Sequence, residues 1–541
     1  MEWIMMKRIL SLLLSLGTLL LLTSCTGTPA ASDDSSSQTN SDGEPDPSKP
    51  TEGVTYSSID YPAETLTFED APTYAAQVKQ ADGNWYNGPT DRGLVTSPYF
   101  TVTVNGENYP VYATRATTSI HSFVYIEVSN PRDEKLSMDL EISLGQLSPA
   151  SCTVLPESSA VSANLTGGKV TARLTELGYY TMIFDDSHTY PLTFIVREEE
   201  PFVCPEGYRV LKMSPGRYDK LTTSPNTVLY FTKGSYELYD ITLLRDSMVY
   251  FETGTYVKAL NLNNGGGFLH GWGTPNVKIQ GHALVDFSGQ AWHTYCPIAF
   301  TRADNMELSG LTLLNSSHWT IPTAQTKNVR VYDMVLIGYR ENSDGITMID
   351  CEDATVENCF VRTGDDVFLV KSTLSREDSY PIVNNNIRFK NCQAWADKTR
   401  AIGVIAETVR DTHNVWFEDC AVLFNQASWS ENLGALVVTS WDATKVYDIH
   451  FNNIEIYRTD FWPISIYGEN DGTNIYDIYF ENIRFNTDYR IQISNTKGGN
   501  IGNIYLDDIY NAGIRTEKLE DLAFRYGGSC SLSNIQLNTQ N

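Results

Sequence analysis

From about residue 205 onward, one pattern of hydrophobic and polar positions repeats along the chain. Asn or Asp comes first, followed by apolar, any, apolar, any, a small or polar residue, and then an apolar residue or Cys. Successive copies start 23 to 34 residues apart. The nine starting positions are Asn276, Asn305, Asn328, Asp353, Asn386, Asn414, Asp448, Asp477 and Asn503.

Repeats of this length are typical of solenoids, propellers and other arrays. The copies hold short β segments and no helical period, which excludes helical and leucine-rich repeats, and propeller blades need about 40 residues or more. We therefore predict a right-handed parallel β-helix over residues 201–541, with one coil per repeat and Asn or Asp at the bends. A stacked series of antiparallel hairpins is the alternative that the pattern leaves open.

Residues 57–200 show a different texture, with short alternating runs separated by turn-forming residues. In "YFTVTVNGENYPVYAT" the dipeptide Asn105-Gly106 is a strong hairpin signal between two strands. The stretch "REEEPF", Arg197–Phe202, marks the boundary to the repeats. We predict a β-sandwich here, so the whole fold is all-β, a β-sandwich followed by a parallel β-helix.

The first 56 residues contain a leader and a linker. Lys7 and Arg8 precede an apolar run from Ile9 to Leu22 that is too short for a comfortable membrane span. The run ends in "LTSC", which resembles the lipobox of bacterial lipoproteins and implies cleavage after residue 24 and lipidation of Cys25. An ordinary signal peptide that happens to carry a cysteine is the alternative.

Residues 25–56 are rich in Ser, Thr, Asp and Pro and have almost nothing to bury, so we expect a flexible tether. No other segment of the chain could span a bilayer. Together with the lipobox, these features predict an extracellular, bacterial cell-surface lipoprotein that is attached to the membrane through lipid at Cys25. We expect the protein to be a monomer.

The formal charge of −27 argues against nucleic acid as a partner, because phosphates need Lys and Arg for neutralisation. It suits a soluble extracellular protein. It also disfavours a strongly anionic substrate, unless a local basic pocket overrides the global field.

Eight cysteines remain besides Cys25, and they form no CxxC or Cys/His metal spacing. An even number in an exported chain permits disulfides. However, Cys359, Cys392 and Cys420 recur at one position of the repeat, which favours stacked thiols in the core. We expect no metal and no cofactor.

A column of polar and aromatic residues follows from the repeat itself. Residues at equal offsets from the repeat start lie above one another in a β-helix, about 4.8 Å apart per coil. Four successive coils place such residues at nearly one height, and three carboxylates lie at the centre. The column consists of His318 and Trp319 at offsets 13 and 14, Asp344 at offset 16, Asp365 and Asp366 at offsets 12 and 13, and Arg400 at offset 14.

Taken alone, each of these motifs has an ordinary structural explanation. Asp-Asp after Gly, as in "VRTGDDVFLVKS", is usually a solvated turn, and "NSDG" (Asn342–Gly345) is a common turn composition. Solvated turns need no shared register with neighbouring coils, so the shared offsets favour a site. Carboxylates about one coil apart repel, so at least one should have a raised pKa and keep its proton near neutrality. Such a pair supplies the acid and the base that glycosidic cleavage requires.

The motifs "NSSHWTI", "NSDG" and "GDDVFLVKS" resemble those of the β-helix glycosidases of families 28 (polygalacturonases) and 49 (dextranases and isopullulanase). Their order and spacing match, with Ser343 in place of Thr, and the resemblance covers residues 205 to 540. A preceding β-sandwich is similar to family 49 architecture. The resemblance implies hydrolysis by a single displacement with inversion. Asp365 would be the general acid, and Asp344 and Asp366 would hold and deprotonate the attacking water.

Two departures from the polygalacturonase pattern concern the substrate. The Gly-His-Gly of that family is replaced by "KTRAIGVIAE", with Arg400 at about the place of the histidine. The Arg-x-Lys that grips the substrate carboxylate is replaced by "LGALVVTSWD", which has no base. We therefore expect a neutral polysaccharide or oligosaccharide, although Lys371 and Arg400 could still bind a uronate, as in a pectin-type polygalacturonase. The residues expected to contact substrate are His318, Trp319, Asn342, Lys371, Arg400, Glu407 and Trp441, with Trp292 and Glu469 as further candidates.

Two other functions fit the same scaffold. A non-catalytic carbohydrate-binding surface protein has no reason to keep three mutually repelling acids. A polysaccharide lyase would need a Ca²⁺ site of several carboxylates together with an Arg or Lys base, and Arg400 and Lys371 keep this possibility open.

Overall fold

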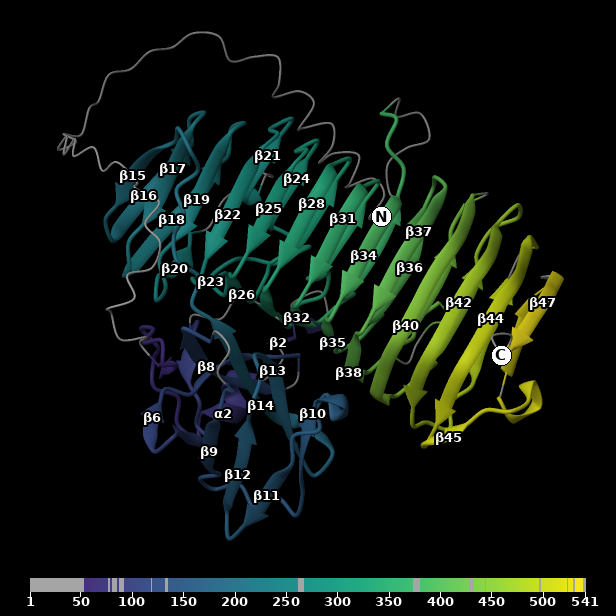
Figure 1. The fold of residues 1–541 in the computed structure, drawn as a ribbon, viewed down its shortest axis with the longest axis horizontal. Coiled ribbons are helices and arrows are strands. Elements are labelled where there is room, and N and C mark those ends of the chain that lie inside the picture. Colours follow the sequence, from purple (N-terminus) through teal and green to yellow (C-terminus); the bar gives the residue numbers. More distant parts are fainter. Residues whose placement is uncertain are drawn as a thin grey trace.

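The computed structural model describes residues 53–538 except for 76–77, 80–84, 87–91, 118, 132–134, 261–266, 373–379, 428–429, 431, 443, 496–497, 523 and 529–530. A seven-stranded sheet, antiparallel except where β14 (Ser187–Glu198) pairs with β8 (Ile120–Ser129), and a five-stranded antiparallel sheet lie beside a 33-stranded, almost entirely parallel sheet that winds through the rest of the chain (Figure 1). The fold is the predicted one, an all-β chain with a β-sandwich followed by a parallel β-helix.

The β-sandwich packs its two sheets around one apolar core. Its Asn105-Gly106 hairpin is confirmed, since β5 and β6 pair antiparallel and the two residues have φ of 51° and 85°. The first sheet runs β10 (Cys152–Leu155), β13 (Gly178–Phe184), β14 (Ser187–Glu198), β8 (Ile120–Ser129), β7 (Tyr112–Arg115) and β4 (Val95–Thr96), with β1 (Thr55–Ser57) beside β8. The second runs β11 (Ala163–Thr166), β12 (Lys169–Leu174), β9 (Met138–Ser143), β5 (Thr101–Val104) and β6 (Glu107–Tyr109).

The structure corrects the end of the predicted tether at residue 56. Strand β1 pairs antiparallel with β8 from Thr55↔Ser129 to Ser57↔Glu127, and Val54 and Tyr56 pack against the sandwich core. The apolar contacts and the ladder hydrogen bonds order residues 53–56, which therefore belong to the sandwich. The leader 1–24, Cys25 and the rest of the tether lie outside the described residues. In the described part of the chain, no helix has the length and apolar character to cross a membrane.

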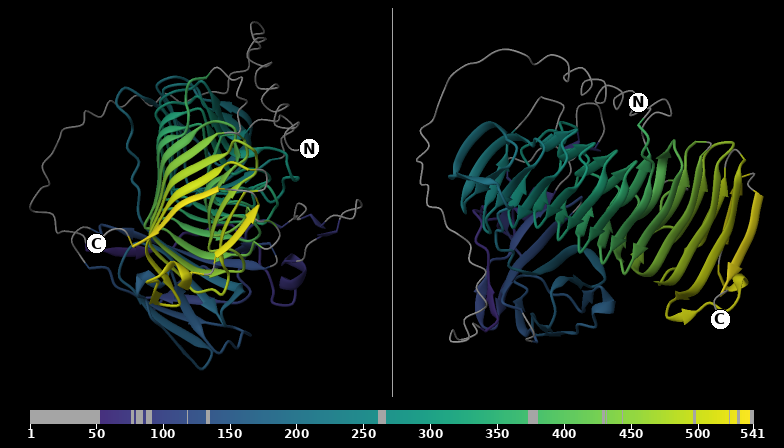
Figure 2. Two further views of the ribbon diagram at one scale, coloured as in Figure 1. Left: turned by 90° about the vertical axis from the view of Figure 1, so that its right-hand side faces the viewer. Right: turned by 45° about the horizontal axis from the view of Figure 1, so that its top comes forward.

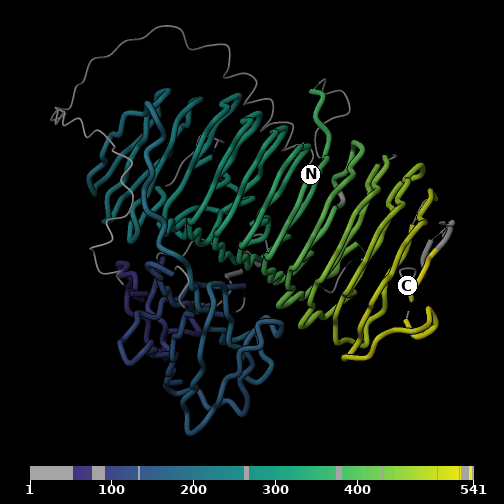
Figure 3. Tube along the Cα trace, in the orientation of Figure 1, coloured from purple at the N-terminus to yellow at the C-terminus, as the bar shows by residue number. Residues whose placement is uncertain are grey.

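Strands of the β-helix stack in three rows. The chain trace shows successive coils following one another along the β-helix (Figure 3). The first row holds the predicted repeats: β22 (Val277–Gly281), β25 (Met306–Ser309), β28 (Lys327–Tyr332), β31 (Glu352–Glu357), β34 (Asn385–Lys390), β37 (Thr412–Glu418), β40 (Lys445–Thr459), β42 (Asn474–Phe485) and β44 (Asn500–Asn511). The second row includes β20 (Tyr256–Ala259), β23 (Leu284–Asp286), β26 (Thr312–Leu314), β29 (Val335–Ile337), β32 (Phe360–Thr363), β35 (Gln393–Ala396) and β38 (Ala421–Asn425). The third row includes β21 (Gly267–Trp272), β24 (Cys296–Thr301), β27 (Ile321–Ala324), β30 (Ile346–Ile349), β33 (Phe368–Ser372), β36 (Ile402–Thr408), β39 (Leu436–Ser440), β41 (Ile464–Gly468), β43 (Ile491–Asn495) and β46 (Phe524–Gly528).

Every repeat begins with a residue in the left-handed region, with φ between 50° and 60° at all nine predicted starting positions. Asn and Asp tolerate this conformation better than other residues with a side chain. Their side chains also join neighbouring coils, as when the amide of Asn305 donates to the side-chain oxygen of Asn276 at 2.8 Å. Two earlier coils, which the sequence analysis missed, begin in the same way. Asn226 and Asp246 both have φ of 54°, and they precede β17 (Thr227–Phe231) and β19 (Ser247–Phe251).

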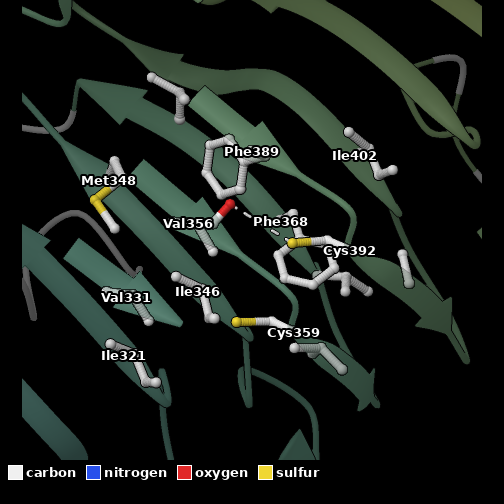
Figure 4. Packing of buried hydrophobic residues seen from close by; sticks show 14 of the residues in the cluster. Ile321, Val331, Ile346, Met348, Val356, Cys359, Phe368, Phe389, Cys392 and Ile402 are labelled. Atoms are coloured by element: carbon white, nitrogen blue, oxygen red, sulfur yellow. Dashed lines mark hydrogen bonds between the residues drawn. The ribbon is translucent and has the colours of Figure 1, made fainter. Parts of the chain in front are cut away.

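The interior of the β-helix is one continuous apolar cluster from Leu229 to Leu522. Aromatic rings stack inside it from coil to coil, with centroids 5.0 Å apart between the Phe389 and Phe417 rings. Cys359, Cys392 and Cys420 are buried free thiols, which confirms the predicted stack of core thiols. Figure 4 shows Cys359 and Cys392 among these apolar side chains.

The β-sandwich packs against the second row. Two further views show the sandwich along one side of the β-helix (Figure 2). One apolar cluster joins Phe123 and Tyr125 of β8 to Phe360 of β32 and Trp395 of β35. The turns that follow the second row therefore lie next to this interface, and these are the turns that carry the predicted column.

Candidate active site

The predicted column forms at the turns between the second and third rows. Trp319, Asp344, Asp366 and Arg400 each lie two residues before the first residue of a third-row strand. Those first residues pair in register from Ile321 through to Ile402. The four side chains thus occupy equivalent positions on four successive coils.

Two glycines allow these turns to stack so closely. A Cβ on Gly364 would lie 2.6 Å from the carbonyl oxygens of both Tyr339 and Arg340. A Cβ on Gly345 would lie 2.5 Å from the carbonyl oxygen of Val367. The glycines of "NSDG" and "GDD" are therefore required by close approach of backbone to backbone.

Asp365 lies at the bend between β32 and β33, and hydrogen bonds fix its carboxylate. The backbone N–H of Asn342 donates to Oδ2 at 2.8 Å, and that of Asp366 donates to Oδ1 at 2.9 Å. The hydroxyl of Thr399 also donates to Oδ1, at 3.3 Å. Burial and the neighbouring charge of Asp366 raise the pKa of Asp365 to about 6, although the two backbone hydrogen bonds and Lys371 oppose the shift.

Asp366 lies in the opposite electrostatic environment. Arg400 Nη1 lies 3.1 Å from its Oδ2 and 3.3 Å from its Oδ1, and the backbone N–H of Arg400 donates to Oδ1 at 3.2 Å. Burial alone would raise the pKa of Asp366, but Arg400 and Lys371 outweigh it and lower the pKa below its ordinary value. Arg400 is held in turn by the carbonyl of Asn432, which accepts from Nε at 2.8 Å.

Asp344 pairs with Lys371 in the interior of the site, where both side chains are 2% exposed. Lys371 Nζ donates to Asp344 Oδ2 at 2.7 Å, lies 3.5 Å from Glu407 Oε2, and stands 4.3 Å from the centroid of the Trp319 ring. Burial lowers the pKa of Lys371, but the three carboxylates of Asp344, Glu407 and Asp366 reverse this and raise it, so the side chain stays cationic. Burial raises the pKa of Asp344, and the ammonium of Lys371 opposes that shift.

The other expected substrate contacts surround this centre. His318 is partly exposed, its Nδ1 lies 3.5 Å from Cys296 Sγ, and burial followed by nearby positive charge lowers its pKa to about 3. The side-chain oxygen of Asn342 is bound by His293 Nε2 at 2.6 Å. Trp441 is 37% exposed on the coil after Arg400, where its backbone N–H donates to Thr408 Oγ1. Lys371 is 2% exposed and forms ion pairs with Asp344 and Glu407, so it lies among the carboxylates of the site.

Several residues of the site were missed or underrated by the sequence analysis. Trp292 stacks on His293 with centroids 3.7 Å apart, and its indole N–H donates to the carbonyl of Glu341. Both lie in the loop before β24, outside the repeat register, so no periodic signal could reveal them. Asn432 links Arg400 to Glu469, because its amide donates to Glu469 Oε1 at 2.8 Å.

The chain is similar to known proteins over part of its length. Probable exopolygalacturonase B of Aspergillus fumigatus is 24% identical over 299 residues, which are 49% of this chain and 60% of that protein. Exopolygalacturonase B of Aspergillus niger is 25% identical over 216 residues, which are 35% of this chain and 46% of that protein. The chain thus spans less than two thirds of the length of these relatives.

Among solved structures, Dex49A from Penicillium minioluteum aligns with a TM-score of 0.60 over 89% of this chain and 99% of its own, at 11% identity. At an identity this low, the structural alignment shows a common fold and nothing more. The coverage extends beyond the β-helix, so the common fold includes the β-sandwich.

A family match is more specific than these pairwise ones. The sequence profile of glycosyl hydrolases family 28 matches residues 229–518, which is more than half of the chain. The match contains Asp344, Asp365 and Asp366 together with the ion pairs around them. By that match, the chain belongs to the glycosyl hydrolases family 28.

Proposed function

We propose that this protein is a glycoside hydrolase that cleaves a polysaccharide or oligosaccharide by a single displacement with inversion at the anomeric carbon. One observation carries the proposal. Two adjacent carboxyl groups, Asp365 and Asp366, have pKa values pushed in opposite directions by their surroundings. Pairs of this kind mark the acid and the base of a site.

The roles follow from these environments. Asp365 gives its proton to the leaving oxygen as the glycosidic bond breaks. Asp344 and Asp366 hold a water molecule that attacks the anomeric carbon, and Asp366, kept ionised by Arg400, accepts the proton that the water loses. One water is consumed per bond, and exchange with solvent restores the two carboxyl groups.

The substrate that we propose is a neutral sugar chain. Both cations of the site are already neutralised by protein carboxylates, Lys371 by Asp344 and Glu407 and Arg400 by Asp366. A uronate would have to compete with these buried pairs for its counter-charge. The net charge of −27 adds long-range repulsion of an anionic polymer.

A pectin-type polygalacturonase is the second candidate, and the names of the curated relatives favour it. A panel of neutral glucans and polygalacturonate, assayed for released reducing ends with an Asp365→Asn control, separates the two. We expect release from a neutral glucan and none from polygalacturonate. Activity on polygalacturonate alone would contradict a neutral substrate. A product released with the same anomeric configuration as the substrate would contradict inversion.

A polysaccharide lyase is disfavoured by the state of its candidate bases. A lyase base must be deprotonated before it can act. The surrounding carboxylates outweigh burial and raise the pKa of both Lys371 and Arg400, so both side chains keep their protons. A non-catalytic sugar-binding protein would not need surroundings that move the pKa values of Asp365 and Asp366 in opposite directions. Absorbance from an unsaturated product would identify a lyase in the same assay.

The pH profile of kcat/KM should fall on its alkaline side with an apparent pKa near 6. The general acid must carry its proton, and the raised pKa of Asp365 keeps it protonated up to about 6 and no further. The base must be ionised, and the lowered pKa of Asp366 satisfies this well below pH 6. Activity that is constant from pH 5 to pH 8 would be incompatible with this assignment.

We also propose that the enzyme acts as a monomer at the outside of a bacterial cell, where lipid on Cys25 and the tether after it attach it to the membrane. The motif "LTSC" before an extended polar segment supports this. Mass spectrometry of the mature amino terminus tests it, since an unmodified cysteine there would contradict the anchor.

A further inference from the structure

A buried ion pair links the ends of two second-row strands just before the turns of the site. Arg362, in β32, lies three residues before Asp365, and Asp397, directly after β35, lies three residues before Arg400. The guanidinium binds the carboxylate through Nε at 3.2 Å and Nη2 at 3.1 Å. The side chains are 1% and 2% exposed, and Trp395 completes the pair by donating its indole N–H to Asp397 at 2.9 Å.

The β-sandwich supplies the remaining partners of this pair. Arg362 Nη1 lies 3.1 Å from His121 Nδ1, and Nη2 donates to the hydroxyl of Ser119 at 3.1 Å. Burial and the charge of Arg362 lower the pKa of His121, so its ring is neutral. Because Arg can only donate, Nδ1 is the acceptor and Nε2–H faces Thr193 Oγ1 at 2.8 Å.

Hydrogen bonds connect the pair to the catalytic turn. The backbone N–H of Asp397 donates to the carbonyl of Thr363 at 3.0 Å. The hydroxyl of Thr363 contacts Ser343 Oγ at 2.9 Å and accepts from the backbone N–H of Asp365 at 3.2 Å. These hydrogen bonds join Arg362 and Asp397 to the turns that carry Asp344, Asp365 and Arg400.

We propose that the β-sandwich positions the catalytic turns through the Arg362–Asp397 pair, with His121 as its positioning residue. This rests on the proposed hydrolase function. A buried ion pair costs desolvation that apolar residues of similar volume would avoid, so burial alone does not account for it. The pair instead fixes orientation, because a bidentate guanidinium holds the two turns in one geometry relative to each other.

The test compares His121→Ala with His282→Ala. His282 is a matched control because it is also buried at the interface, where its Nδ1 binds Glu127 of the sandwich at 2.8 Å, yet it lies between β22 and β23, on a coil before those that carry the three aspartates. We expect His121→Ala to lower kcat by about 10²-fold with KM changed by only a few-fold, since small misplacements of catalytic groups have effects of this size. His282→Ala should keep its kcat, and His121→Asn, which restores an acceptor, should recover much of the loss.

Crystal structures of the same variants give a readout that does not depend on activity. Displacement of Asp365 and Asp366 in His121→Ala, with both unmoved in His282→Ala, is the expected result. Unmoved carboxylates in His121→Ala would overturn the proposal, as would equal kcat values for the two alanine variants. If His121→Ala does not fold, Ser119→Ala removes another sandwich contact of Arg362 and takes its place. A wild-type enzyme without glycosidase activity would count against the hydrolase function, while the displacements still decide the positioning role.

Discussion

An Asp365→Asn variant should lose about 10²- to 10⁴-fold in kcat while its KM stays close to that of the wild type. Asparagine has nearly the same shape, and its single side-chain oxygen can keep one of the two hydrogen bonds that the N–H groups of Asn342 and Asp366 donate to separate oxygens of Asp365. What it lacks is a proton to give to the leaving oxygen. The loss should therefore fall on the chemical step.

Steady-state kinetics on two substrates make this test specific. An aryl glycoside with a good leaving group needs little protonation, so its hydrolysis should suffer much less than that of the natural glycan. The matched control is Asp353→Asn, since Asp353 occupies a repeat start where the neighbouring coils carry asparagine and its side-chain oxygen accepts from Asn386 at 2.7 Å. Near wild-type kcat in Asp365→Asn on the natural glycan would remove Asp365 as the general acid.

Periodicity made the fold and the centre of the site predictable. The Asn and Asp of the repeats reflect a real backbone requirement, since all nine starting positions have left-handed φ. Counting offsets from them placed Asp344, Asp366 and Arg400 on one column even though the offsets ranged from 13 to 16. The scatter arises from unequal turns between the rows, and it disappears when residues are counted back from the third-row strands.

Contacts without a period could not be predicted in this way. His293 reaches Asn342 from a loop 49 residues away, and His121 reaches Arg362 across 241 residues of sequence. Neither separation in sequence corresponds to the repeat, so the repeat pattern could not predict either contact. The ion pairs of Lys371 could not be predicted either, because its partners Asp344 and Glu407 become its neighbours only when the coils stack.

A Lys371→Met variant should combine a large loss of stability with a loss of activity. Methionine is long, unbranched and apolar, so it fills the buried space without the charge. Removing one partner of a buried ion pair typically costs about 3–5 kcal/mol, and here Asp344 and Glu407 lose their shared cation at pH 7. Lys371 lowers the pKa of all three aspartates, so each pKa should rise in the variant, and kcat should fall by about 10²-fold or more as Asp344, which helps to hold the attacking water, becomes protonated.

The pH dependence distinguishes lost charge from lost packing. In the variant, Asp344 has a folded-state pKa raised further above its unfolded value, so its protonation stabilises the fold at low pH and this contribution disappears as pH rises. Urea unfolding should therefore show a smaller difference from wild type at pH 5 than at pH 7. Lys327→Met is the control, because Lys327 pairs with Glu352 at the surface and both remain partly exposed, so its stability should be nearly unchanged at either pH. An equal loss at pH 5 and pH 7 in Lys371→Met would mean that packing, and not the ion pair, is what the lysine contributes.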